Sequence, residues 1–367
     1  MTRIPVTILT GFLGAGKTTL LNRLMTEPAF GDTAVIVNEF GEAGIDGALV
    51  ADADDRAFAM STGCLCCTYS GDVRLTLLRL VDEAERGVGP AFSRVVIETT
   101  GLADPAPVIQ TFMVNDLMLE RFTLNGVVTL VDSVQGQSVL DRFDEARRQV
   151  AVADLVLLGK TDLVCDSGRQ RDVGQLLDSL RRLNPGSRLL DGQEVTAETV
   201  FSLAAWDPAG KPPDVAAWIG SGQTGHDHHD HEHGGHHHAH SHDHDHQHDV
   251  NRHGDMVTAY CYSATRPVHP QGLANAVQVL QATFGPDLLR IKGLVEIAGQ
   301  PGCPRVLHVV GYLSAPPRFL DGWPAGLDET RIVMIVSGPG RNEAAEMLCS
   351  FLPELVPFAA EPEAAAS

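Results

Sequence analysis

The sequence predicts an α/β domain with a mostly parallel sheet, followed by a linker and a smaller α+β domain. Short runs of Val, Ile and Leu alternate with segments of helical periodicity over the first part of the chain. A histidine-rich segment then interrupts this pattern, and beyond it several strands are grouped between two helices. The predicted boundaries are 1–200 for the first domain, 201–255 for the linker, 256–357 for the second domain and 358–367 for a disordered tail.

In the first domain, the apolar runs predict strands that are buried on both faces. We expect strands at 6–9, 34–37, 94–97, 126–131 and 155–158, and helices at 17–25 and 73–84. Nearly continuous apolar runs, rather than alternating ones, are typical of strands in a parallel sheet covered on both sides. The order of strands and helices therefore predicts helices on both faces of the sheet.

In the second domain, the strands follow one another with few helices between them. We expect strands at 256–263, 289–297, 305–312 and 331–336, and helices at 271–284 and 342–351. This grouping is typical of a small α+β domain.

Composition limits the kinds of partner. The 367 residues suffice for about two domains, and the formal net charge is −20. Such an acidic chain is a poor match for phosphate backbones or anionic lipid, so we expect no nucleic-acid and no membrane partner. The chain has no apolar run long enough for a transmembrane helix. Its seven cysteines are unevenly spread, which is unlike a secreted disulfide framework and indicates a reducing, cytoplasmic location.

A glycine-rich turn follows the first predicted strand. Residues 11–18, GFLGAGKT, fit the pattern G-x-x-x-x-G-K-[ST] between a strand and a helix. Backbone N–H groups of such a turn surround phosphate oxygens, the lysine neutralises the β- and γ-phosphates, and the hydroxyl ligates Mg²⁺. The first domain is therefore predicted to be a P-loop NTPase domain. Its predicted nucleotide-binding residues here are Gly11, Gly14, Ala15, Gly16, Lys17, Thr18 and Thr19.

An acid ends the strand predicted at 94–97. Glu98 stands where P-loop enzymes place an acid that holds the Mg²⁺ hydration shell, and Gly101 follows three residues later. The usual form of this motif is D-x-x-G, so Glu98 replaces the aspartate, and Gly101 would offer its N–H to the γ-phosphate. We expect Lys17, Thr18 and Glu98 to act in catalysis; the alternative is a strand-end carboxylate with no role.

The base would be selected by the residues after the strand at 155–158. Lys160 and Asp162 fit the guanine motif [N/T]-K-x-D, in which one carboxylate accepts both N–H groups of the base edge. The lysine stem would lie along the base. The first motif position is Gly159, so the side-chain bond that this position usually makes to the P-loop is lost. GTP is favoured over ATP as the nucleotide.

Three thiols are concentrated in four residues. Cys64, Cys66 and Cys67 form a C-x-C-C motif that can bind Zn²⁺, Cu⁺, Ni²⁺ or Co²⁺. The flanking residues are typical of loops, so we expect a metal-binding loop with a fourth ligand from elsewhere; the alternative is a set of small buried hydrophobic residues. Glu39 and Glu42 follow the second strand, in a segment where GTPases keep a nucleotide-sensing switch, and could serve Mg²⁺ or a second metal.

These motifs together resemble the CobW family of metal-linked GTPases. They occur in the family's order: 11–19, 38–42 (NEFGE), 63–67 (GCLCC), 98–105 (ETTGLADP) and 160–162 (KTD). The resemblance extends through the linker into the C-terminal part. It implies a GTPase whose three cysteines bind the transferred metal, commonly zinc or cobalt, with GTP and metal binding coupled. Family members serve zinc homeostasis, cobalamin synthesis or nitrile hydratase activation, and the motifs do not choose among these.

The linker is rich in histidine, with 13 among the 23 residues of 226–248. Neutral imidazoles on a flexible strand would bind transition metals at many weak, exchanging sites, which suits capture and transfer to the thiols. A solvated linker without a role is the alternative. The predicted ligands are His226, His228, His229, His231, His233, His236, His237, His238, His240, His242, His244, His246 and His248.

The leading hypothesis is therefore a GTP-hydrolysing metallochaperone or metal insertase that uses GTP, Mg²⁺ and Zn²⁺ or Co²⁺ and has a metal-receiving client. Segments 39–46 and 98–104 would act as switches around the nucleotide. Two rivals remain: a metal buffer or sensor without useful turnover, and an ATP-using P-loop kinase. The oligomeric state also remains open between a monomer and a nucleotide-dependent homodimer.

Overall fold

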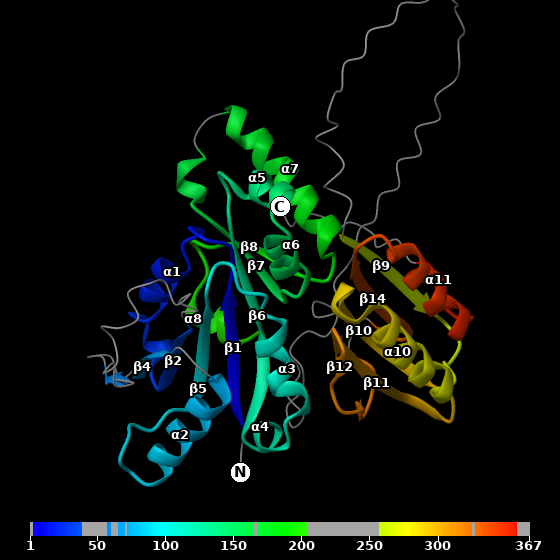
Figure 1. The fold of residues 1–367 in the computed structure, drawn as a ribbon, viewed down its shortest axis with the longest axis horizontal. Coiled ribbons are helices and arrows are strands. Elements are labelled where there is room, and N and C mark those ends of the chain that lie inside the picture. Colours follow the sequence, from blue (N-terminus) through cyan, green and yellow to red (C-terminus); the bar gives the residue numbers. More distant parts are fainter. Residues whose placement is uncertain are drawn as a thin grey trace, which may run out of the picture.

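The structure, a computed structural model, describes residues 3–38, 57–59, 65–69, 72–164, 167–203, 257–324 and 327–357. Two β-sheets form within these ranges, and they lie beside one another (Figure 1). None of the helices in this described part is long and apolar enough to cross a membrane. The predicted histidine-rich segment and the 358–367 tail lie outside the described residues.

In the described part of the first domain, eight strands form one sheet in the order β3-β4-β2-β5-β1-β6-β7-β8. They are β1 (Ile4–Thr10), β2 (Thr33–Asn38), β3 (Ala57–Ala59), β4 (Leu65–Tyr69), β5 (Arg94–Thr99), β6 (Phe122–Asp132), β7 (Leu155–Gly159) and β8 (Arg188–Asp191). All neighbouring pairs are parallel except β3 and β4, which are antiparallel. The five strands expected from the apolar runs are confirmed as β1, β2, β5, β6 and β7.

Helices cover both faces of this sheet, as predicted. They are α1 (Lys17–Leu24), α2 (Val73–Glu85), α3 (Ala106–Val114), α4 (Asp116–Arg121), α5 (Gly136–Arg142), α6 (Asp144–Ala151), α7 (Ser167–Leu183) and α8 (Ala197–Phe201). Successive side chains of a strand point to opposite faces of the sheet, so neighbouring residues of one strand pack in different hydrophobic clusters. Leu9 of β1 packs with Leu20 and Leu24 of α1, whereas Ile8 packs with Ile109 of α3.

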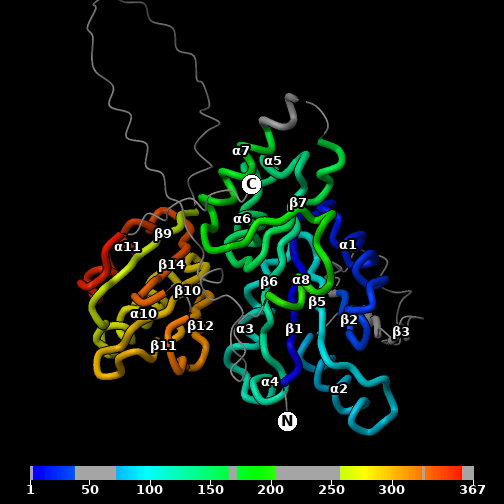
Figure 2. The backbone as a smooth tube through the Cα atoms, turned by 180° about the vertical axis from the view of Figure 1, so that it is seen from behind, coloured from blue at the N-terminus to red at the C-terminus, as the bar shows by residue number. Residues whose placement is uncertain are grey.

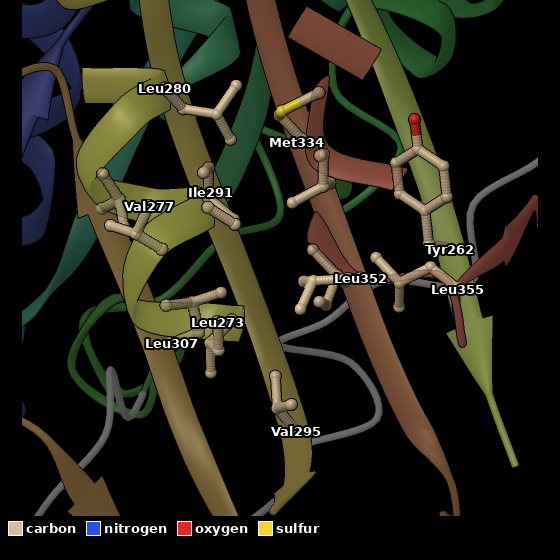
Figure 3. Close-up of a cluster of buried hydrophobic side chains, with 14 of the residues drawn as sticks. Tyr262, Leu273, Val277, Leu280, Ile291, Val295, Leu307, Met334, Leu352 and Leu355 are labelled. Carbon is tan, nitrogen blue, oxygen red and sulfur yellow. The ribbon is translucent and has the colours of Figure 1, made fainter. Parts of the chain in front are cut away.

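The second sheet is antiparallel and has the order β12-β11-β10-β14-β9-β15, with β13 paired to β11. Its strands are β9 (Val257–Ala264), β10 (Leu288–Ile297), β11 (Gln300–Val310), β12 (Leu313–Ser314), β13 (Arg318–Phe319), β14 (Thr330–Ser337) and β15 (Val356–Pro357). Helices α10 (Pro270–Phe284) and α11 (Arg341–Phe351) pack on one face. Figure 3 shows Leu273 and Leu280 of α10 in one cluster with Ile291 of β10 and Met334 of β14.

The other face of the second sheet packs on the first domain. Helices α3, α6 and α7 lie between the two sheets (Figure 2). A single hydrophobic cluster joins Leu176 and Leu180 of α7 to Cys261 of β9 and Val333 of β14. A buried ion cluster adds to this contact: Arg290 Nη2 donates to Asp154 Oδ1 at 2.9 Å, and Lys292 binds the same oxygen. The two domains therefore share a core.

Candidate nucleotide and metal site

The P-loop connects β1 to α1 at residues 11–16. Gly11, Gly14 and Gly16 take φ angles of 140°, 74° and 100°, which residues with side chains rarely adopt. A side chain at Gly11 would also collide with the carbonyl oxygen of Leu130, 2.3 Å from the ideal Cβ position. The glycine pattern seen in the sequence thus folds into the turn that a phosphate requires.

Lys17 is held inside this turn. Its side chain is 8% exposed, and Nζ donates to the carbonyl oxygens of Gly11 at 2.8 Å and Phe12 at 3.4 Å. Burial lowers the pKa of Lys17, whereas the nearby charge of Glu98 acts in the opposite direction. The predicted lysine is therefore fixed by the loop itself.

Thr18 and Glu98 meet at the start of α1. The Thr18 hydroxyl donates to Glu98 Oε1 at 2.9 Å, and Glu98 is 5% exposed at its position in β5. A hydroxyl beside a carboxylate is a hard oxygen donor set that suits Mg²⁺. These residues thus fit the predicted ion. Thr19, the next predicted residue, lies exposed on the first turn of α1.

Three loops bring the predicted base-binding residues together. Lys160 takes a φ of 59°, and its Nζ binds Asp132 Oδ2 at 2.6 Å. Asp162 accepts a hydrogen bond from Gln193 Nε2 at 3.2 Å, and the Thr161 hydroxyl donates to Asp191 Oδ1 at 2.9 Å. Lys160 and Asp162 are therefore positioned by residues of the β6 and β8 ends.

Asp132, Asp191 and Gln193 were not among the residues predicted from the sequence. A usable signal existed for Asp132, since it ends a buried apolar strand as Glu98 does. Asp191 and Gln193 follow β8, a strand with partly exposed residues that the apolar pattern did not reveal.

Gly159 lies directly against the P-loop. A Cβ at this position would stand 2.9 Å from the carbonyl oxygen of Ala15. Where the usual motif carries Asn or Thr, this chain brings two backbone segments into contact. The glycine at this motif position thus allows the end of β7 to lie close to the P-loop.

Most of the predicted metal ligands fall outside the described residues: Glu39, Glu42, Cys64 and all thirteen predicted histidines. The backbone of Cys66 and Cys67 is described, and it belongs to β4. The expectation that these cysteines lie in a loop was wrong, because the segment pairs in parallel with Val35 and Ile36 of β2. Within the described ranges, no group of three or more His, Cys, Asp and Glu side chains could hold a metal ion.

Comparisons with known proteins agree with this geometry. Residues 5–190 match the CobW/HypB/UreG nucleotide-binding domain, and residues 257–352 match the cobalamin synthesis protein cobW C-terminal domain. The zinc chaperone YjiA of Escherichia coli is 42% identical over 184 residues, which are 50% of this chain and 56% of that protein. The zinc-regulated GTPase metalloprotein activator 1 of Schizosaccharomyces pombe is 38% identical over 168 residues, 44% of this chain and 40% of that protein.

A solved structure extends the likeness to both domains. The crystal structure of Zn(II)-bound YjiA GTPase from E. coli matches with a TM-score of 0.67 at 27% identity, covering 96% of this chain and 99% of that one. The sequence matches to the curated relatives span about half the length of those proteins. With both family models matched in chain order, the predicted resemblance is confirmed: the chain belongs to the CobW/HypB/UreG family and carries the CobW C-terminal domain.

Proposed function

We propose that this protein is a GTP-hydrolysing metallochaperone, which binds a transition metal at Cys64, Cys66 and Cys67 and delivers it to a client protein. GTP binding and hydrolysis are supported by the geometry of the P-loop, which holds Lys17 inside the turn and Thr18 against Glu98. Guanine is the favoured base because the Asp162 carboxylate can accept both N–H groups of its edge. Mg²⁺, when bound, would neutralise phosphate charge during hydrolysis.

The sheet supports coupling between the nucleotide and the thiols. Strand β2 lies between β4 and β5, and its Val37 is the register partner of both Thr68 and Glu98. Neighbouring strands are about 4.8 Å apart, so the backbone of Thr68, next to Cys67, lies about 10 Å from that of Glu98. A change at Glu98 on GTP binding would therefore reach the cysteine strand across one intervening strand.

Zinc is the metal favoured by the relatives, since YjiA and CobW are both described as zinc chaperones. Thiolates bind both zinc and cobalt, so the ligand type alone does not separate the two metals. The histidine-rich segment 226–248 would collect ions weakly and pass them to the thiols. Protons compete for imidazole, so this loading should weaken below about pH 6.5.

Two variants of the full chain test this proposal. One lacks residues 226–248, and the other carries Ser in place of Cys64, Cys66 and Cys67. Zn²⁺ is titrated against a chelator with GTP or GDP present. The deletion should lower the number of ions bound and keep one tight, GTP-sensitive site, whereas the serine variant should lose that site and keep the weak ones.

Turnover separates the chaperone from its rivals. Single-turnover hydrolysis is measured with GTP and ATP, with and without Zn²⁺ or Co²⁺. An absence of GTP hydrolysis under every metal would favour a buffer or sensor, and a preference for ATP would favour a kinase. A serine variant that keeps the tight, GTP-sensitive site would overturn the role proposed for the thiols.

A further inference from the structure

A buried glutamine of α6 holds the segment that follows Glu98. Gln149 is 1% exposed, and its Nε2 donates to the carbonyl oxygens of Gly101 at 3.0 Å and Ala103 at 3.1 Å. Its own backbone carbonyl accepts a hydrogen bond of 2.8 Å from the Thr129 hydroxyl in β6. Gln149 is thus bound to the sheet through its backbone and to residues 101–103 through its side chain.

The segment that Gln149 holds also touches the P-loop. A Cβ at Gly101 would stand 2.6 Å from the backbone nitrogen of Leu13. Residues 101–103 therefore lie between the phosphate-binding turn and α6. The two hydrogen bonds from Gln149 set the position of this segment relative to the turn.

Packing alone does not account for a glutamine here. Gln149 Oε1 is buried and has no hydrogen-bond partner among the described residues. A buried acceptor without a partner costs about 1–3 kcal/mol, and a methionine of similar size would avoid this cost. The benefit of the glutamine therefore lies in its two N–H donors.

The preceding residue of α6 reaches the second domain. Arg148 Nη1 donates to the carbonyl oxygen of Pro286 at 2.8 Å, and Nη2 lies 3.5 Å from Asp287 Oδ1. The same guanidinium lies 3.9 Å from Asp104 Oδ2, at the end of the segment that Gln149 holds. Consecutive residues of one helix thus connect 101–104 with the C-terminal domain.

We propose that Gln149 is a positioning residue for GTP hydrolysis, and that α6 makes the position of 101–104 and the docking of the C-terminal domain depend on each other. This inference rests on the proposed GTPase function. Gln149 fixes the backbone of residues 101–103, and in this position the Gly101 N–H can donate to the γ-phosphate. Arg148 contacts both Asp104 and residues 286–287, so a movement of segment 101–104 also moves residues 285–288 of the C-terminal domain.

The kinetic test replaces Gln149 with Met in the full chain. Two neutral hydrogen bonds are lost, so kcat for GTP should fall about tenfold. KM and GDP affinity should stay close to those of the parent protein. The thermal midpoint should also change little, because removing the unpaired Oε1 offsets the loss of the donor to the Gly101 and Ala103 carbonyl oxygens. The matched control is Asn125→Leu, which removes another buried amide, bonded to Thr7 and Val200. That control should lower the thermal midpoint and leave kcat unchanged.

The coupling test measures hydrogen exchange at residues 285–288 with GDP and with a non-hydrolysable GTP analogue. The parent protein should show a difference between the two nucleotides, and Gln149→Met and Arg148→Gln should each reduce it. The two substitutions should also be non-additive in kcat.

The outcomes are distinguishable. An unchanged kcat in Gln149→Met, or a loss of kcat together with stability as in a structural variant, would overturn the positioning role. An undiminished exchange difference in both variants would overturn the link to the C-terminal domain. If the parent protein binds GTP without hydrolysing it, the proposed function fails, and the exchange measurement still decides the link.

Discussion

The Thr18 hydroxyl donates a 2.9 Å hydrogen bond to the Glu98 carboxylate, which joins the first turn of α1 to the end of β5. The two residues are 80 positions apart in the sequence and belong to two separate motifs. Their contact brings the phosphate-binding turn and the strand-end acid together at the place where the sequence predicts Mg²⁺.

Glu98→Gln should weaken the use of Mg²⁺. The amide keeps the size of the side chain and removes the negative charge that attracts the hydrated ion. We expect the Mg²⁺ concentration for half-maximal GTP hydrolysis to rise about tenfold. Glu120→Gln, an exposed acid of α4, is the charge-matched control. Equal Mg²⁺ dependence of the two variants would contradict the assignment.

Gly159→Asn should reduce GTP affinity even though it restores the common form of the guanine motif. The new Cβ would stand 2.9 Å from the Ala15 carbonyl oxygen, so the P-loop must shift. Forced shifts of packed backbone cost about 1–3 kcal/mol, which corresponds to roughly tenfold or more in affinity. Gly174→Ala in α7 is the control, because no atom lies within 4 Å of its added Cβ. Tighter GTP binding by the asparagine variant would refute this expectation.

Asp162→Asn should reduce the preference for GTP over ATP by about 100-fold, because an amide cannot accept both N–H groups of guanine as a carboxylate does. Competition of GTP, GDP and ATP for a fluorescent nucleotide measures this preference. Asp178→Asn, on the exposed surface of α7, changes the net charge equally and should have no effect. A preference at the parental level would place base selection elsewhere.

Stability should decline as the pH falls below about 6.5, because His308 is kept neutral between the two domains. Burial, followed by the charges of Arg290 and Lys292, lowers the pKa of His308 to about 3 from 6.5. Between these values the unfolded chain binds a proton that the folded chain does not, so the free energy of unfolding decreases as the pH drops. The charges of Arg290 and Lys292 outweigh burial and keep the pKa of Asp154 below its ordinary value of 3.8. Asp154 therefore also lowers the free energy of unfolding as the pH falls, but only near pH 3.8 and below.

Denaturant unfolding between pH 7 and 4.5 checks this prediction. The midpoint of the parent protein should shift down with pH, and His308→Leu should flatten that shift. A parallel pH dependence in the variant would assign the effect to other groups.

The sequence allowed prediction of the elements whose chemistry is local. Apolar runs identify β1, β5 and β7 because these strands are buried on both sides, and the glycines at 11–16 mark the P-loop because their backbone angles exclude other residues. The cysteine strand β4 could not be predicted in this way. Thr68 and Tyr69 favour strands, but the Gly and Ser residues on either side of the segment are typical of loops, and pairing with β2 decides its conformation.

The contacts that position the site residues also join segments that are far apart in the sequence. Gln149 reaches Gly101 across 48 residues, and Gln193 reaches Asp162 across 31. No periodicity in the sequence encodes such pairs, because each partner is typical of its own helix or loop. The motif residues were therefore predictable, whereas Gln149 and Gln193, which hold them in place, were not.

The core shared by the two domains has a consequence for biosynthesis. The first domain leaves the ribosome before β9 and β14 exist, so Leu176 and Leu180 of α7 have no partner strands at that stage. We expect this apolar face to make the nascent chain prone to aggregation until the second domain has been synthesised. Truncation before residue 257 would make that state permanent, and we expect the truncated chain to aggregate unless the face is made polar.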